Sequence, residues 1–139
     1  MRVFVGVVLM SLCTSISALA AGSSQPYGQG GWFEKFDPIV RQYNQSGEQF
    51  RIEGHCQSAC TLFLGIRNVC IVSSARLLFH AGHDRNRNIS PSATRHLMSA
   101  YNGRLRAYLT ANHVMDTLAF HTISGSDMIS KFGYRECSG

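Results

Sequence analysis

One continuous apolar stretch in the middle of the chain most restricts how it can fold. Residues 58–66 read "SACTLFLGI", in which the apolar side chains are Ala59, Cys60, Leu62, Phe63, Leu64 and Ile66. A helix over these residues is apolar on nearly all sides, and such a helix has to be buried. The rest of a small chain must therefore supply strands and helices that surround it.

Patterns on both sides of this segment predict strands. Alternating or continuous apolar residues bounded by turn residues predict strands at 49–53, 69–72 and 75–80. The stretch 22–31, "GSSQPYGQGG", is typical of turns and predicts neither strand nor helix.

A spacing of three and four residues between apolar side chains predicts two longer helices, over 32–46 and 92–112. Pro38 is expected to interrupt or kink the first, and Gly103 to weaken the second by roughly 1 kcal/mol relative to alanine. A shorter apolar segment at 114–123 and a last helical turn or two within 126–134 follow. This order indicates an α/β domain, a short and mostly parallel sheet flanked by helices.

The first twenty residues have the pattern of a cleaved export signal. Arg2 precedes an apolar stretch at 3–13, and Ala18-Leu19-Ala20 supplies a small-x-small cleavage site. The apolar stretch is shorter than the roughly 20 residues that cross a bilayer. We therefore expect residues 21–139 to form one exported domain, periplasmic or secreted, without a membrane span.

Four cysteines remain after the signal: Cys56, Cys60, Cys70 and Cys137. An even number in an exported chain predicts two disulfides, and four cysteines allow three pairings. Cys56–Cys60 with Cys70–Cys137 is the pairing we favour, because an i, i+4 separation on a helix suits a bridge.

A zinc site is the alternative use of these cysteines. Three of them with His80 and His83 provide suitable ligand types, but the spacing C-x3-C-x9-C fits no standard zinc knuckle. An oxidising compartment also favours disulfides. We expect no metal and no cofactor.

The net charge of the whole chain is +5, and loss of Arg2 reduces it to about +4. The arginines are scattered rather than gathered in a run, whereas binding to phosphates needs cations on one face. We therefore expect no nucleic-acid partner.

Ser58 and His80 are the candidate chemical pair. Ser58 begins the buried helix at the carboxyl edge of a strand, and the strand at 75–80 returns to that edge and ends at His80. A serine at a helix start, with a neutral imidazole in reach, has the parts of an activated nucleophile. Two simpler roles stay open: Ser58 as a helix cap and His80 as a core histidine.

The residues around this pair resemble a known superfamily. "GG" at 30–31, "FRIEGHCQSACTLFLG" at 50–65 and "ARLLFH" at 75–80 are similar to the Clp-protease proteolytic subunits and crotonases. More closely, the chain resembles small exported bacterial proteins with a C-x-S-A-C motif. The similarity extends from about Gly30 to Cys137.

The resemblance implies roles for particular residues. It implies Ser58 as nucleophile, His80 as base, and Gly31 and Ala59 as donors to an oxyanion. The family's third member is an aspartate late in the chain; Asp116 falls nearest in the order of elements, whereas Asp127 has the place of a helix cap. The family's first ββα repeat has no counterpart in this sequence.

Two functions follow as expectations. The first is an exported serine hydrolase that cleaves a peptide or small ester by acyl transfer. The alternative is a non-catalytic binding or assembly module on the same scaffold, since the family forms homo-oligomeric rings or trimers. A coenzyme A or acyl site of the crotonase kind is a third, which an exported compartment disfavours.

The polar loop at 81–91 follows His80 directly. It contains His83, Asp84, Arg85 and Arg87, which either line a substrate cleft or form an ordinary solvated loop.

Overall fold

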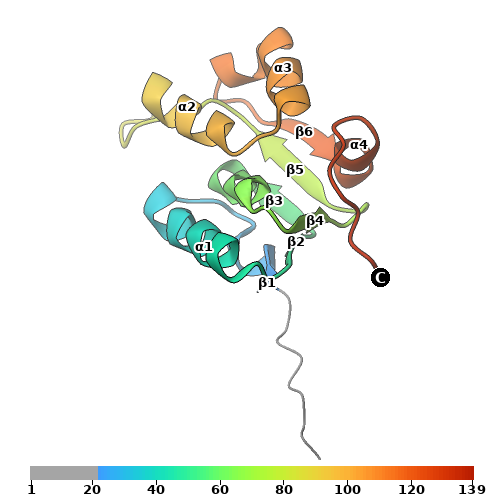
Figure 1. Cartoon of the computed structure of the whole chain (residues 1–139). Coiled ribbons are helices and arrows are strands. Elements are labelled where there is room, and N and C mark those ends of the chain that lie inside the picture. Colours follow the sequence, from blue (N-terminus) through green and yellow to red (C-terminus); the bar gives the residue numbers. More distant parts are fainter. Residues whose placement is uncertain (1–21) are drawn as a thin grey trace, which may run out of the picture.

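A computed structural model describes residues 22–139 of this protein (Figure 1). The proposed signal at 1–20 lies outside the described residues. Within 22–139, no helix combines the length and hydropathy that crossing a membrane requires.

The strands form two small sheets rather than one. In the first, β1 (Gly22–Ser23), β2 (Phe50–Ile52) and β4 (Val69–Ile71) lie in the order β1-β2-β4, and all pairs are parallel. In the second, the order is β3-β5-β6. Here β3 (His55–Gln57) pairs in parallel with β5 (Arg76–Phe79), which pairs antiparallel with β6 (His121–Ser124). The fold is therefore mixed α/β, as expected, with the strands divided between two sheets.

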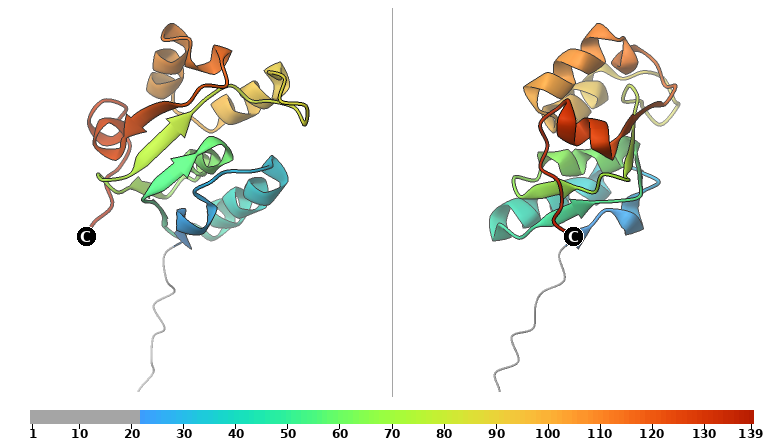
Figure 2. Two further views of the ribbon diagram at one scale, coloured as in Figure 1. Left: turned by 180° about the vertical axis from the view of Figure 1, so that it is seen from behind. Right: turned by 90° about the vertical axis from the view of Figure 1, so that its right-hand side faces the viewer.

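Gly54 explains the division. The strand expected at 49–53 is β2, and Gly54 follows it with a φ of 64°, in the left-handed region that glycine tolerates. The chain turns there and continues as β3 in the second sheet. It then repeats this course, from β4 to β5, so that strand, strand and helix follow one another twice (Figure 2).

The segment before α1 corrects the expectation for 22–31. It contains β1 and a 3-10 helix, η1 (Gln25–Tyr27). A side chain at Gly22 would collide with the rings of Tyr43 and Phe50. This strand therefore pairs through its backbone and carries no apolar pattern that a sequence could reveal.

The central helix η2 (Ser58–Gly65) is buried from Ala59 to Leu64, as its composition requires, but it is a 3-10 helix. The Thr61 hydroxyl donates a hydrogen bond to the Ser58 carbonyl at 2.7 Å. A side chain thus binds one of the backbone carbonyl groups in the first turn of this helix. η2 packs against α1, α2 and β5. Phe63 of η2 packs in the core against two other buried phenylalanines, Phe36 and Phe50.

Two helix expectations change. α1 (Phe33–Ser46) runs through Pro38 without a break, and Gly47 is its C-cap residue. The helix expected at 92–112 is two helices, α2 (Pro91–Ser99) and α3 (Gly103–Ala111). The Asn102 side chain accepts the Leu105 N–H at 3.0 Å and caps α3, so Gly103 opens a helix instead of weakening one.

The C-terminal third ends in η3 (Val114–Asp116), β6 and α4 (Gly125–Ser130). Ser124 caps α4 by accepting the Asp127 N–H at 3.1 Å, so Asp127 is not the cap. Asp127 instead pairs with Lys131 at 3.1 Å.

Both disulfides join the cysteines in the pairing that we favoured, Cys56–Cys60 and Cys70–Cys137. The second ties the C-terminal segment to β4, where Ile71 also donates to the Arg135 carbonyl at 2.8 Å and accepts the Cys137 N–H at 3.0 Å. Two disulfides are typical of exported proteins.

We predict that the two bridges contribute unequally to stability. Replacing Cys70 and Cys137 by serine removes a bridge between residues 67 positions apart. In the chain-entropy model this should lower the free energy of unfolding by about 4 kcal/mol. The same change at Cys56 and Cys60, only four residues apart, should cost about 2 kcal/mol. Urea unfolding of both double variants gives the comparison, and a larger loss from the short bridge would contradict it.

Candidate active site

The parallel pairing of β3 with β5 brings Ser58 and His80 to one edge of the second sheet. Gln57 is the Cα partner of Leu78, Ser58 follows Gln57 directly, and His80 follows two residues after Leu78. Both therefore leave the carboxyl ends of neighbouring strands. Both also line one cavity of about 600 Å³.

Ser58 has an unusual backbone conformation. Its φ is 56°, in the left-handed region that non-glycine residues rarely adopt. Strain of this kind costs on the order of 1–3 kcal/mol and concentrates at functional sites. The residue lies at the sharp turn from β3 into η2.

The Ser58 hydroxyl is not a helix cap. Gln57 occupies the cap position of η2, without a side-chain cap bond, and the Ser58 Oγ makes no hydrogen bond among residues 22–139. No buried side-chain nitrogen or oxygen in this range lacks a partner, so an unbonded Oγ has to be accessible.

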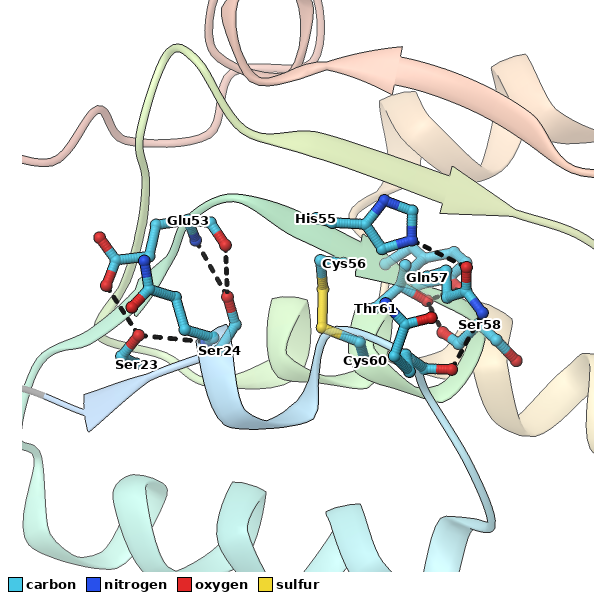
Figure 3. The surroundings of a disulfide bond; sticks show 12 residues. Ser23, Ser24, Glu53, His55, Cys56, Gln57, Ser58, Cys60 and Thr61 are labelled. Carbon is cyan, nitrogen blue, oxygen red and sulfur yellow. Dashed lines mark hydrogen bonds between the residues drawn. A yellow bond between two sulfur atoms is a disulfide. The ribbon is translucent and has the colours of Figure 1, made fainter.

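A disulfide and side-chain hydrogen bonds stabilise the turn around Ser58 (Figure 3). Cys56 and Cys60 are fully buried, and their Cα atoms lie 5.3 Å apart across the disulfide. Thr61, which donates to the Ser58 carbonyl, is also within 2.5 Å of the buried Tyr101 hydroxyl. The bridge and the hydrogen bonds therefore hold the strained residue in place.

The His80 imidazole is held in one orientation. Its Nδ1 lies 2.6 Å from the Ala81 carbonyl oxygen, an acceptor, so Nδ1 carries the proton and donates it. The neutral ring then has its lone pair on Nε2. Nε2 has no partner in the described part of the chain and must be accessible, although His80 as a whole is only 6% exposed.

Burial lowers the pKa of His80 below its usual value of 6.5. The hydrogen bond to Ala81 opposes this shift, and the charges of His83 and Arg87 add to it. The imidazole is therefore neutral at pH 7, the form that accepts a proton.

Asp116 forms no hydrogen bond or ion pair with His80. Its carboxylate lies 2.8 Å from the Nδ1 of His113, and both side chains are exposed. Across residues 22–139, no carboxylate forms a hydrogen bond with His80, because the Ala81 carbonyl occupies the position that an orienting carboxylate takes.

Of the two expected oxyanion donors, Ala59 follows Ser58 in the chain, and Gly31 follows a glycine that approaches Ser58. Gly30 has a φ of 74°, and a Cβ on it would lie 3.0 Å from the Ser58 Cβ, so this loop approaches the serine closely. Gly31 lines the cavity, and its N–H has no acceptor among the described residues. Ala59 is the second residue of η2, where N–H groups have no acceptor within the helix.

Two hydrogen bonds hold the glycine loop against the serine. The Gln57 N–H donates to the Gly28 carbonyl at 2.9 Å, and the Gln57 side chain donates to the Gln29 carbonyl at 3.0 Å. The segment that precedes α1 thus contributes to the site at the start of η2.

The polar loop after β5 lines the same cavity with His83, Asp84, Arg85 and Arg87. Two exposed aromatic residues that the sequence analysis did not single out join it, Trp32 (47% exposed) and Phe120 (51% exposed). Trp32 follows Gly31 directly and was therefore open to prediction, whereas no sequence signal places Phe120 there. Within 22–139, no group of three His, Cys, Asp or Glu side chains is arranged to hold a metal ion.

We predict that glycine is more favourable than alanine at position 58. A left-handed φ strains alanine but not glycine. The free energy of unfolding of Ser58→Gly should therefore be about 1 kcal/mol higher than that of Ser58→Ala. Ala107→Gly, within α3, is the control and should lose roughly 1 kcal/mol. Equal stability of the two position-58 variants in urea unfolding would rule out the left-handed turn.

Comparison of the chain with known proteins finds no matching family model, curated protein or solved structure.

Proposed function

We propose that this protein is an exported serine hydrolase that cleaves a peptide or small ester by acyl transfer. The observation that carries the proposal is the pair of unbonded atoms at one cavity, the Ser58 Oγ and the His80 Nε2. Each of the two simpler roles would occupy the atom in question with a hydrogen bond inside the protein.

The proposed reaction has two steps. The Ser58 Oγ attacks the substrate's carbonyl carbon while His80 Nε2 takes the hydroxyl proton. The resulting oxyanion accepts hydrogen bonds from the N–H groups of Gly31 and Ala59. The imidazolium then gives its proton to the leaving amine or alcohol, and a water molecule, activated in the same way, releases the acid and restores Ser58.

Two further features support this proposal. A strained turn from strand to helix is how hydrolases of another fold expose a serine nucleophile, and Ser58 has such a turn. The repeated order of strand, strand and helix, across two sheets, is in keeping with the ββα repeats of the Clp-protease and crotonase superfamily.

A second function is favoured by one observation, the missing carboxylate at His80. A carboxylate would stabilise the imidazolium that forms during the reaction, and loss of the aspartate costs about 10⁴ in rate where it has been measured. The Ala81 carbonyl sets the tautomer but carries no full charge. A non-catalytic binding or homo-oligomeric assembly module on this scaffold is therefore the alternative.

We predict covalent labelling of Ser58 by a fluorophosphonate probe in the folded, oxidised protein. Ser58→Ala should abolish the adduct, and His80→Ala should slow labelling by about 10² to 10⁴, the usual contribution of a general base. Asp116→Asn is the matched control and should label at the wild-type rate, because Asp116 bonds to His113.

Intact-mass measurement and peptide mapping would follow the adduct. Absence of label on Ser58, or labelling that His80→Ala leaves unchanged, would favour the non-catalytic module.

The rate of labelling should depend on pH through His80. Only the neutral imidazole accepts a proton, and burial lowers its pKa below 6.5, so the rate should stay nearly level from pH 8 to 7. It should fall at lower pH, as His80 becomes protonated. A rate that already declines between pH 8 and 7 would show that burial does not lower this pKa.

A further inference from the structure

The cavity wall beside His80 contains a continuous row of aromatic and cationic side chains that acyl transfer itself does not require. The Arg85 guanidinium carbon lies 4.7 Å from the centre of the Trp32 ring, and Trp32 packs edge-on against His83. His83 stacks on His80 with ring centres 6.0 Å apart, and the Phe120 ring meets His80 edge-on at 5.1 Å. The catalytic imidazole is thus one member of a larger surface.

The loop that presents the cations is ordered by its own hydrogen bonds. His83 and Ile89 form a backbone bridge across it. The Asp84 carboxylate accepts the N–H groups of Asn86 and Asn88 at 2.8 and 2.9 Å. This carboxylate is therefore engaged inside the loop, and the loop offers Arg85 and Arg87 from a fixed turn.

The cavity offers positively charged side chains to an anionic ligand. Arg85 and Arg87 line it, and neither forms an ion pair within residues 22–139. A guanidinium stacked on a ring keeps its in-plane N–H groups free for two parallel bonds to a carboxylate. Glu34, on the first turn of α1, is the other carboxylate of the lining.

We infer that the substrate carries a carboxylate close to a large apolar side chain, an inference that rests on the proposed hydrolase function. Arg85 and Arg87 would bind the carboxylate, and the exposed rings of Trp32 and Phe120 would contact the apolar group. The carboxylate has two chemical sources in a peptide, the C-terminus or an acidic side chain.

Such a substrate also addresses the missing carboxylate at His80. Neighbouring positive charges disfavour the imidazolium that forms during attack on the substrate. A carboxylate bound at Arg87 would offset one of these charges only when substrate is present. The chain would then depend on its substrate for part of the stabilisation that a resident aspartate gives.

Binding without chemistry tests the inference. Trp32 is the only tryptophan of the chain, so its fluorescence reports on this cavity. In the oxidised Ser58→Ala protein, N-acetyl-phenylalanine should bind at least about tenfold more tightly than N-acetyl-phenylalaninamide, since hydrogen bonds to charged groups are the strong ones. N-acetyl-aspartyl-phenylalaninamide distinguishes the sources: tight binding indicates a side-chain carboxylate as well, and weak binding indicates the C-terminus.

Matched variants separate a specific site from general attraction. Arg85→Gln with Arg87→Gln should reduce the tenfold preference to about one. Arg41→Gln removes the same kind of charge from an exposed position on α1 that does not line the cavity, and it should keep the preference.

Equal binding of acid and amide, no saturable fluorescence change with any probe, or a preference that survives the double variant would each overturn the inference. Because the probes are not cleaved, these results are independent of fluorophosphonate labelling. Failure of labelling counts against the hydrolase, whereas loss of discrimination counts against the carboxylate site.

Discussion

The pairing of β3 with β5 is the interaction on which the proposed site depends. Parallel strands in this register deliver the residues after Gln57 and after Phe79 to one edge, so a hydroxyl and an imidazole separated by twenty-two positions line one cavity. A shift of one residue would turn every side chain of the short β3 to the opposite face. The register is held by burial, since Cys56 and its partner Leu77 are both fully buried.

Several constraints converge on Ser58, and together they explain how a strained residue persists. The Cys56–Cys60 bridge closes the turn, Thr61 binds its carbonyl, and Gly30 lies against it where no side chain would fit. Strain of about 1–3 kcal/mol is a considerable part of the 5–15 kcal/mol by which small domains are stable. The strained conformation of Ser58 persists because these contacts hold it. It also exposes the Ser58 Oγ, which would cap the helix if the residue had the usual backbone conformation of an N-cap.

Much of this arrangement could be predicted from the sequence, because the strongest signals were burial and cysteine number. The apolar run at 58–66 identified the central helix, and the strand ending near His80 predicted the edge that it shares with Ser58. What the sequence could not reveal depends on the backbone: the turn at Gly54 that divides the sheet, the strand at Gly22 that pairs without a pattern, and the Asn102 cap that splits one helix into two. Asp116 was chosen by its order in the chain, but hydrogen bonding assigns it to His113 and leaves the Ala81 carbonyl to orient His80.

The His80 imidazole is oriented by a carbonyl, buried, and flanked by cations. These surroundings favour the neutral form, which can accept a proton, but they disfavour the imidazolium that forms during the reaction. That balance is consistent with a hydrolase whose activity depends on the charge that its substrate brings. The most direct measurement is the separation of the Ser58 Oγ and the His80 Nε2 in a crystal structure of the oxidised protein. Our account predicts hydrogen-bond reach, about 2.6–3.2 Å, or a single bridging water. Two atoms that face different spaces, with another protein group bonded to Nε2, would contradict it.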